Sequence, residues 1–283
     1  MTVPVPAPCF DLRRTLESGQ VFHWMPAAEP GAYRGLIGTT PVTVRQEGET
    51  LLVPRGREAL CRHYFALDHP MEAIYATFPR DTAMAEALAF CHGMRILRQP
   101  PWECLATFIT SAMKQVKQIA AISHTLRERY GRRVAGGLYA YPEPKRLARC
   151  TEEELRACGL GFRAGKLLAT ARMVAAGEVE LEALRPLPDA EALAQLCRLP
   201  GVGEKIANCV LLFAYERVRA FPIDVWIARA IRHHYARPEA TLAELAVFCA
   251  GYFGPYGGYA QQYLFHHARN RPRGFWHSSP PCT

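Results

Sequence analysis

The sequence lacks the patterns that would assign it to several common classes of protein. It contains no C-x-x-C spacing, which disfavours a zinc finger or an iron–sulfur cluster. It has no uninterrupted run of about 18 apolar residues, and its N-terminus, MTVPVPAPCFDLRR, has neither a basic segment nor a long apolar core. No repeat or low-complexity segment occurs. These absences predict a cytoplasmic protein with no transmembrane helix and no signal peptide.

The cysteines and the charge are the first positive signals. The chain has 10 cysteines, and several lie inside apolar stretches such as ECLATFI and ANCVLLF, which is typical of buried free thiols in a reducing compartment. Among its 283 residues, 34 are Lys or Arg and 26 are Asp or Glu, giving a formal net charge of +8. An excess of basic residues favours an anionic partner, with nucleic acid ahead of a membrane surface. Because charge also serves solubility alone, it does not decide the function.

The residue pattern changes along the chain from strand-like to helical. QVFHW, AYRGLIG, PVTVRQEG and TLLVPR are short segments bounded by turn residues, which predicts strands of a small antiparallel sheet. From about Glu58 the pattern becomes helical, and the segment 103–131 has apolar spacings of three and four up to Gly131, a candidate helix stop. TEEELRACG begins with a capping-box pattern. We expect an α+β protein with a small antiparallel sheet domain at 1–95, a mostly α-helical domain at 96–270 and a tail at 271–283.

A glycine-rich turn lies between two predicted helices, DAEALAQLCRLPG and EKIANCVLLFAYE. Gly201 and Gly203 permit positive φ and close approach of another backbone. The second helix should begin at Glu204 or Lys205, so its free N–H groups would face out of the turn and suit a phosphate diester. An ordinary helix–turn–helix corner would use glycine in the same way, so the turn alone leaves both interpretations open.

Five segments resemble one family when they are taken together. LPGVGEKIANCVLLFA…FPIDVWIARAI resembles the helix–hairpin–helix, at about 190–216, and the following Pro…Asp segment of the base-excision DNA glycosylase superfamily. LESGQVFHW, LRQPPWECLATFITSA, GLGFRAGKLLATAR and GPYGGYAQQYLF resemble segments of the 8-oxoguanine DNA glycosylases within it. The matches follow the family's order over nearly the whole chain. The resemblance implies a bifunctional DNA glycosylase and AP lyase that excises 8-oxoguanine.

The resemblance implies two catalytic residues. Lys205 would be the nucleophile that forms a Schiff base with the sugar, and a helix N-terminus and an apolar neighbour such as Cys209 would favour its neutral amine. Asp224 would stabilise positive charge at the sugar and help orient or activate the amine. Taken alone, Lys205 would be a solvated residue in a first helical turn. Asp224 would be the N-cap of the helix VWIARAIRHHY, a role compatible with catalysis.

The resemblance also implies a pocket for the flipped base. The backbone carbonyl of Gly19 would accept from the N7–H of 8-oxoguanine, a hydrogen that guanine lacks. Gln261 would read the Watson–Crick edge, while Phe265 and Cys209 would hold the two faces of the base. Without the family, Phe265 would be expected in the core and Gln261 on the surface.

Further positions are expected to contact DNA, and several depart from the family pattern. The expected contacts are Gly201, Val202, Gly203, Met113, Lys114, Gln118, Phe162, Arg163 and Trp226. Met113 and Lys114 replace an Asn-rich patch, and Trp226 replaces a histidine. Arg163 matches one of two arginines that read the opposite cytosine, whereas Gln118 stands at the other. We therefore expect a weaker preference for cytosine opposite the lesion.

The implied partner is double-stranded DNA containing an oxidised purine. The resemblance implies a compact prokaryotic-type monomer at the nucleoid, with no cofactor, no membrane contact and no metal apart from a possible monovalent cation on the hairpin's backbone carbonyls. The alternatives are a glycosylase for another damaged base, a non-catalytic helix–hairpin–helix DNA-binding protein, or a helical protein unrelated to DNA. Lys205 together with Asp224 argues against the non-catalytic module, which needs neither residue.

Overall fold

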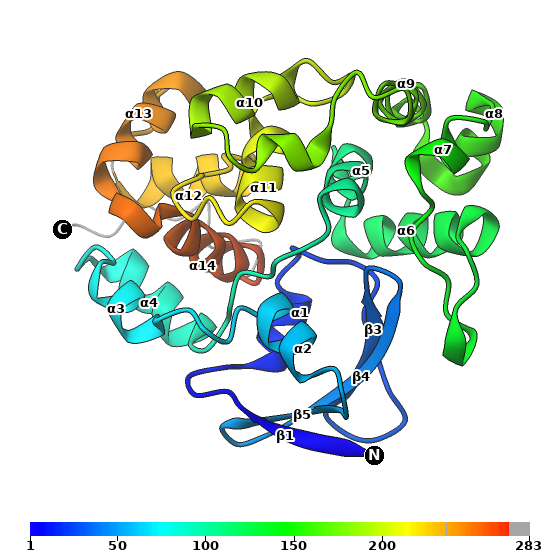
Figure 1. The fold of residues 1–283 in the computed structure, drawn as a ribbon. Helices are drawn as coiled ribbons and strands as arrows, with labels where there is room; N and C mark the ends of the chain where they lie inside the picture. The colour runs from blue at the N-terminus through cyan, green and yellow to red at the C-terminus, as the bar shows by residue number, and fades with distance from the viewer. Residues whose placement is uncertain (236, 272–283) are drawn as a thin grey trace.

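The computed structural model describes residues 1–235 and 237–271 (Figure 1). The expected fold class is confirmed: a five-stranded antiparallel sheet forms the N-terminal part, and helices form the rest. The N-terminal elements are β1 (Thr2–Pro6), α1 (Leu12–Glu17), β2 (Met25–Pro26), β3 (Ala32–Ile37), β4 (Thr40–Glu47), β5 (Thr50–Pro54), α2 (Glu58–Tyr64), α3 (Met71–Ala76) and α4 (Thr82–Cys91). The later helices are α5 (Pro101–Ser111), α6 (Val116–Tyr130), α7 (Pro144–Leu147), α8 (Glu152–Leu155), α9 (Arg163–Ala175), α10 (Asp189–Cys197), α11 (Glu204–Ala214), α12 (Val225–His234), α13 (Leu242–Tyr252) and α14 (Gly257–Arg269).

The sheet has the strand order β1-β5-β4-β3-β2, with every neighbouring pair antiparallel. Val5 lies opposite Leu51, and both side chains are buried in a core that the sheet shares with α1 and α2. The sequence interpretation missed β1, because its segment VPVP contains two prolines. Both prolines lie on an edge strand, where the missing N–H costs no ladder hydrogen bond.

The strand expected at QVFHW is wrong, because residues 21–24 form no strand and β2 begins only at Met25. The side chains of this segment form hydrogen bonds away from the sheet ladder. His23 is buried, with Nε2 2.8 Å from Leu36 O and Nδ1 3.1 Å from Glu103 Oε1. Gln99 donates from Nε2 to Gln20 O over 2.7 Å. These contacts hold the segment between the sheet and α5.

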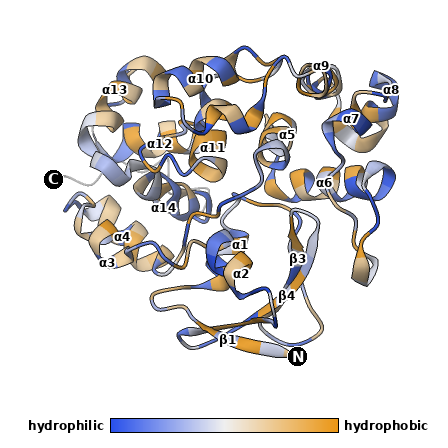
Figure 2. Ribbon diagram, in the orientation of Figure 1, coloured by the Kyte–Doolittle hydropathy of each residue, from blue (hydrophilic) through white to orange (hydrophobic). Residues whose placement is uncertain are grey.

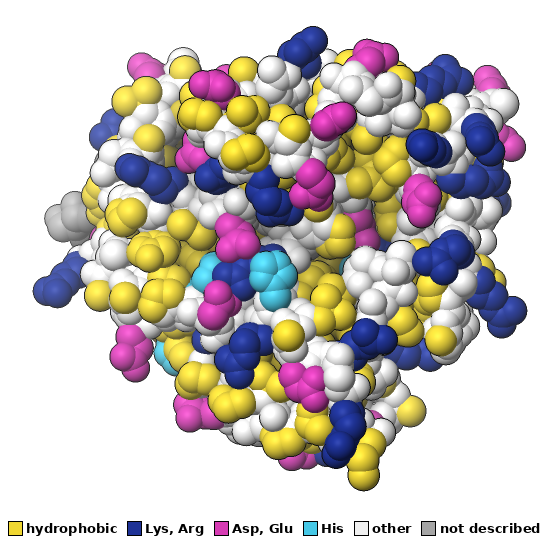
Figure 3. All heavy atoms as spheres, viewed as in Figure 1, with side chains coloured by type: hydrophobic (Ala, Val, Ile, Leu, Met, Phe, Trp, Pro, Cys, Tyr) yellow, Lys and Arg dark blue, Asp and Glu magenta, His cyan; other side chains and the backbone are white. Residues whose placement is uncertain are grey.

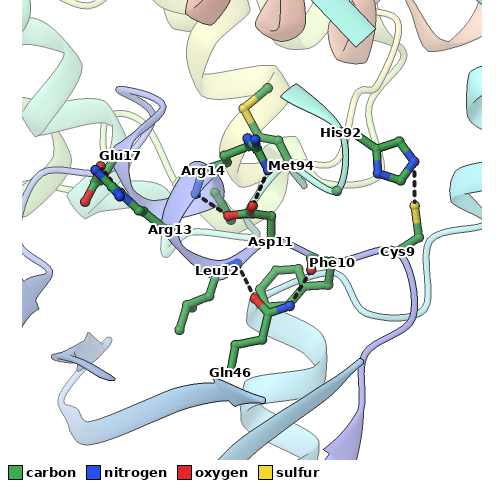
Figure 4. Close-up of polar contacts among 12 residues, drawn as sticks. Cys9, Phe10, Asp11, Leu12, Arg13, Arg14, Glu17, Gln46, His92 and Met94 are labelled. Carbon is green, nitrogen blue, oxygen red and sulfur yellow. Dashed lines mark hydrogen bonds and ion pairs between the residues drawn. The ribbon is translucent and has the colours of Figure 1, made fainter. Parts of the chain in front are cut away.

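Helix α1 was also missed, and it fixes the loop that follows it. Asp11 is its N-cap and accepts from Arg14 N over 2.7 Å. Gln46 of β4 accepts from Leu12 N over 2.7 Å and donates to Phe10 O over 2.5 Å, so one side chain attaches the start of the helix to the sheet (Figure 4). The loop 18–20 therefore leaves α1 from a fixed position.

The helical pattern predicted for 103–131 ends at Tyr130 as expected but contains a break. Helix α5 ends at Ser111 and α6 begins at Val116. Met113 has a φ of 54°, a left-handed conformation that no continuous helix contains. The side chains of Gln115 and Gln118 form a capping box that starts α6. The capping box expected at Thr151 is confirmed, with Thr151 and Glu154 as its members.

The helical core is built around α5 and α11, which Figure 2 draws largely in hydrophobic colours. Helices α9 and α10 pack on this pair, and α14 packs on α4 and α12. Nine of the ten cysteines lie in the described residues, and all nine are free thiols, seven of them buried. The predicted tail lies outside the described residues except for Arg271.

The expected domain boundary at 95/96 stays a prediction, since the chain around it contacts both parts. Arg95 donates from its guanidinium to Ala66 O over 2.8 Å and to Pro8 O over 2.7 Å. One residue earlier, Met94 O accepts from the Tyr263 hydroxyl of α14 over 2.8 Å. This segment therefore fastens the N-terminal part to the C-terminal helix.

Candidate active site and DNA interface

The hairpin between α10 and α11 is anchored on one side and open on the other. Gly201 has a φ of 84°, and a Cβ added there would lie 2.9 Å from Lys166 Cβ. Of the two hairpin glycines, only Gly201 has a positive φ. Gly203 has an extended backbone with a φ of −100° and is the N-cap of α11. A Cβ at Gly203 would meet no protein atom within 4 Å. The exposed Gly203 can therefore let a DNA backbone approach the N-terminus of α11.

Two features of the turn limit what else it can contact. The side chain of Val202 is buried, so only its backbone is available to DNA. Thr170 of α9 donates to Pro200 O over 2.8 Å, and Val202 N donates to Leu199 O over 3.0 Å. Leu199 O and Pro200 O thus have protein donors already, and a monovalent cation on the carbonyls of the hairpin stays a prediction.

Lys205 and Cys209 lie one turn apart on α11. The ammonium Nζ of Lys205 lies 5.5 Å from the centre of the Phe108 ring, a residue of α5. Burial raises the pKa of Cys209 to about 11, and the nearby Lys205 acts in the opposite direction. Cys209 is therefore a neutral thiol that gives the lysine an apolar neighbour.

Asp224 has the N-cap role expected for it. Its Oδ1 accepts from Ile227 N over 2.9 Å and from Trp226 N over 3.0 Å. Burial raises the pKa of Asp224, while these backbone amides and the positive charges of Lys205 and Arg269 oppose that rise. Both hydrogen bonds use Oδ1, which leaves Oδ2 available to the cavity that Asp224 lines.

One cavity brings together most of the residues singled out from the sequence. Its volume is about 1910 Å³, larger than the ~300–1,000 Å³ of a usual small-molecule pocket. A volume of this size accommodates a base together with a neighbouring stretch of DNA backbone. The predicted site residues among its lining are Gly19, Met113, Lys114, Gly203, Lys205, Cys209, Asp224, Trp226, Gln118, Gln261 and Phe265.

Gly19 enters this cavity from the N-terminal part of the chain. It has a φ of 90°, and a Cβ added there would lie 3.3 Å from Phe265 Cε1 and 2.5 Å from Arg269 Nη1. The loop is fixed on its other side by Gln20, whose side chain donates to Arg95 O over 2.8 Å and accepts from Leu97 N over 2.8 Å. Only glycine fits here, for reasons of both conformation and space.

Helix α14 supplies one wall of the cavity. Gln261 is 4% exposed, and its Oε1 has no hydrogen-bond partner among the described residues. Phe265 follows one turn later and is half-buried. The sequence interpretation missed Arg269, which lies one further turn along the same face and also lines the cavity. Its spacing of four from Phe265 was the available signal.

The predicted DNA-contact residues outside the hairpin differ in exposure. Met113 is 90% exposed on the 112–115 link, and Phe162 is 53% exposed. Arg163 is buried, with Nε donating to Ala112 O over 2.5 Å and Nη1 to Leu160 O over 3.0 Å. Its guanidinium also lies 4.2 Å from the centre of the Phe162 ring. Arg163 therefore supports the link that carries Met113, and its role toward DNA stays a prediction.

Basic side chains are most frequent on the part of the surface formed by α6 to α9 in the view of Figure 3.

Among residues 1–235 and 237–271, no cluster of three His, Cys, Asp or Glu side chains could hold a metal ion. No helix in that part of the chain has the length and apolar character needed to span a membrane.

Two family models match the chain in succession. Residues 2–105 match the N-terminal domain of 8-oxoguanine DNA glycosylase, and residues 106–247 match the HhH-GPD superfamily of base excision DNA repair proteins. The N-glycosylase/DNA lyase OGG1 of Arabidopsis thaliana is 30% identical over 89% of this chain and 75% of its own length.

Two solved structures agree over the same extent. One is MBOgg1 in complex with a low-affinity DNA ligand, with 34% identity, 95% of each chain covered and a TM-score of 0.90. The other is the 8-oxoguanine glycosylase/lyase of Clostridium acetobutylicum in complex with double-stranded DNA containing cytosine opposite 8-oxoguanine. It has 32% identity, 95% of each chain covered and a TM-score of 0.88.

The geometry of the hairpin gives the first prediction. Gly203→Val adds a side chain that meets no protein atom, so the fold should be retained with only the modest loss of stability expected of a poorer N-cap, while the approach of DNA is blocked. Affinity for undamaged duplexes of any sequence should fall, and its dependence on salt should flatten. Fluorescence anisotropy over a salt series measures both. Gly201→Ala is the contrasting variant, because its positive φ and the contact with Lys166 should lower the melting temperature. Unchanged binding by Gly203→Val would exclude a phosphate contact at this turn.

Proposed function

The chain belongs to the 8-oxoguanine DNA glycosylase family of the HhH-GPD superfamily and is an N-glycosylase/DNA lyase that removes 8-oxoguanine from DNA, and we propose that Lys205 and Asp224 carry out its chemistry. The observation that carries this assignment is that the first turn of α11 and the N-cap of α12 line the same cavity. A lysine nucleophile and a nearby carboxylate suit cleavage at C1′ through a Schiff base, since one forms the covalent bond and the other stabilises positive charge on the sugar.

The proposed reaction begins with extrusion of the damaged nucleotide, at a cost of a few kcal/mol. The neutral amine of Lys205 attacks C1′, and the C1′–N9 bond breaks with its electron pair leaving on the base, which takes up a proton. Nζ then loses a proton and the C1′–O4′ bond breaks, with O4′ taking up a proton, so the sugar ring opens and a Schiff base joins Nζ to C1′. Loss of a C2′ proton expels the 3′ phosphate by β-elimination and nicks the strand. Phe108 and Cys209 lie beside the amine and form the apolar part of its surroundings.

Asp224 acts on the positive charge that develops on the sugar. Because its Oδ1 is held by two backbone amides, the carboxylate has a fixed orientation before the substrate arrives. A fixed charge in a cavity of low dielectric constant stabilises a cationic transition state more than a solvated one does. The same fixed position keeps the Asp224 carboxylate near the Lys205 amine, so it can also help to orient the amine or accept its proton.

The proposed base pocket lies between Phe265 and Cys209, with the Gly19 carbonyl accepting from N7–H. The unpaired, buried Oε1 of Gln261 suits the N1–H and N2–H donors of the Watson–Crick edge. Gly19 favours 8-oxoguanine, because an acceptor at this position would face the lone pair of N7 in guanine.

The proposed partner of this chain is double-stranded DNA containing an oxidised purine, bound by a monomer at the nucleoid. Support comes from the Clostridium acetobutylicum structure, which contains such a duplex. The exposed Met113 suits insertion into the base stack that extrusion leaves open, as apolar residues do in other DNA-bending proteins. Lys114, its neighbour on the same link, suits a phosphate.

Replacing the nucleophile is the direct test of Lys205. Incubation with an 8-oxoguanine duplex and borohydride should leave a covalent protein–DNA adduct, and Lys205→Gln should abolish it while DNA binding is largely retained. Lys166→Gln is a matched control, because it removes an exposed positive charge beside the hairpin but outside the cavity. Adduct formation by Lys205→Gln at the wild-type level would move the nucleophile to another residue.

Substitution of the carboxylate separates its charge from its capping role. Asparagine is also a good N-cap, so Asp224→Asn should preserve α12 and DNA affinity while slowing base release much more. Because burial raises the pKa of Asp224, wild-type release should decline toward acid pH earlier than for an ordinary aspartate. Single-turnover rates against pH should lose this acidic limb in the variant. Equal losses of affinity and rate would instead indicate a purely structural cap.

Selectivity for the opposite base should be weak. Two N–H groups of Arg163 are bonded to backbone carbonyls, and Gln118 is uncharged with its Oε1 accepting from Gln115 N. Loss of one cytosine contact should relax the preference for cytosine over adenine by ~10–100-fold. Single-turnover excision from the four opposite-base duplexes measures this. A steep cytosine preference that Gln118→Arg fails to increase would contradict the proposal and point to Lys114 or Lys117 as the replacement donor.

A further inference from the structure

Three side chains form a line on α14 along the wall of the cavity. Gln261, Phe265 and Arg269 are spaced four residues apart, and each lines the cavity. Side chains at this spacing lie on one helix face, and the first and last Cα atoms are separated by ~12 Å along the axis. The ring in the middle is the surface on which the proposed function stacks the base. The two polar groups therefore lie toward opposite edges of that base.

Both polar residues carry a buried atom without a hydrogen-bond partner among the described residues. Gln261 presents an acceptor, Oε1, and Arg269 presents a donor, Nη1. An unsatisfied buried polar group is costly and rare in a folded protein, so each one calls for a physical explanation. An acceptor at one end of a stacking surface and a charged donor at the other suit a planar ligand with donors on one edge and an acceptor on the other.

The guanidinium of Arg269 is held so that Nη1 remains free. Its Nη2 donates to Glu17 O over 2.8 Å and lies 3.3 Å from Nδ1 of His266. Burial lowers the pKa of His266 to about 4, so the imidazole is neutral and its Nδ1 can accept from Nη2. Both hydrogens of Nη2 are thereby used. Nη1 lies against Gly19, since a Cβ there would be 2.5 Å from it.

We propose that Arg269 is a specificity-determining residue that donates from Nη1 to the C8 carbonyl oxygen, O8, of the flipped 8-oxoguanine. The inference rests on the proposed function and adds a second reader of the lesion beside the Gly19 carbonyl. In 8-oxoguanine, N7–H and O8 are adjacent, as are the Gly19 backbone and Nη1. Guanine has a hydrogen on C8 and no acceptor there, so it would leave Nη1 without this hydrogen bond.

A second carbonyl oxygen, O6, also flanks N7, and the position of Arg269 favours O8 over it. Arg269 is close enough to Asp224 that each charge favours the ionised form of the other. Asp224 marks the sugar end of the cavity, and O8 is on the sugar side of N7. O6 is on the side of the Watson–Crick edge, which Gln261 faces. The donor Nη1 of Arg269 therefore matches the acceptor O8 at the C8 edge of the base.

Sulfur substitution tests the contact one oxygen at a time. Single-turnover excision is measured for 8-oxoguanine, for 8-thioguanine, which keeps N7–H but has a weaker acceptor at C8, and for 8-oxo-6-thioguanine. Wild type and Arg269→Met are compared as ratios of rates, so the intrinsic reactivity of each base cancels. We expect the ratio of rates for 8-oxoguanine over 8-thioguanine, the 8-thio ratio, to fall ~10–100-fold in the variant. The ratio for 8-oxoguanine over 8-oxo-6-thioguanine, the 6-thio ratio, should stay unchanged.

Other outcomes would overturn the inference. If Arg269→Met slows all three substrates by one factor, Arg269 only positions the Gly19 loop through Glu17. A change confined to the 6-thio ratio would assign Nη1 to O6 instead. Failure of wild type to release 8-oxoguanine would contradict the proposed function itself, which is a distinguishable result.

Two further variants keep the test decisive. Arg271→Met removes a positive charge from the same helix end, but Arg271 pairs with Glu86 and does not line the cavity, so both ratios should match wild type. Arg269→Lys covers the case in which Arg269→Met does not fold. The ammonium group of lysine cannot bond Glu17 O and reach the base at the same time, as the two Nη atoms of arginine can. The preference for 8-oxoguanine over 8-thioguanine should therefore fall in part. A wild-type ratio in a folded Arg269→Lys would exclude the contact.

Discussion

The contact between the loop at Gly19 and helix α14 is the constraint on which the rest of the site depends. Gly19 lies so close to Phe265 and Arg269 that no side chain fits, and Arg269 ties the loop to α14 through Glu17 O. Residues separated by about 250 positions in the sequence thereby line one cavity. The sheet, α1 and the buried side chain of Gln20 have the common effect of fixing this loop at one distance from the helix.

The helical part places the two proposed catalytic residues at the ends of two helices. Lys205 is in the first turn of α11, at the positive end of the helix dipole. Asp224 is the N-cap of α12, where the same dipole favours a carboxylate, although burial raises its pKa. The N-termini of α11 and α12 line one cavity, with the basic Lys205 at the first and the acidic Asp224 at the second. An amine and a carboxylate therefore line the same cavity.

The sequence predicted features that depend on local chemistry and missed those that depend on tertiary contacts. The capping box at Thr151, the N-cap at Asp224 and the start of α11 could be predicted, because each follows from neighbouring residues. The break at 112–115 could not, since Ala, Met, Lys and Gln are all good helix formers. The break is stabilised from a distance, by Arg163 donating to Ala112 O. QVFHW was mistaken for a strand for the same reason, because its partners are side chains far away in the sequence.

The site residues divide in the same way. Lys205, Asp224 and the base-pocket residues were identified through a family resemblance, and no rule of periodicity or spacing singles them out. Arg269 lies outside the matched motifs and becomes visible only when its unpaired Nη1 is seen beside Gly19. In the proposed site, the chemistry and the contacts to the edges of the base therefore rest on different elements. Lys205 and Asp224 belong to α11 and α12, whereas the proposed contacts to the two edges of the base belong to α14 and the Gly19 loop. If the proposed roles hold, substitutions along α14 should alter which base is accepted and leave Lys205 and Asp224 in place.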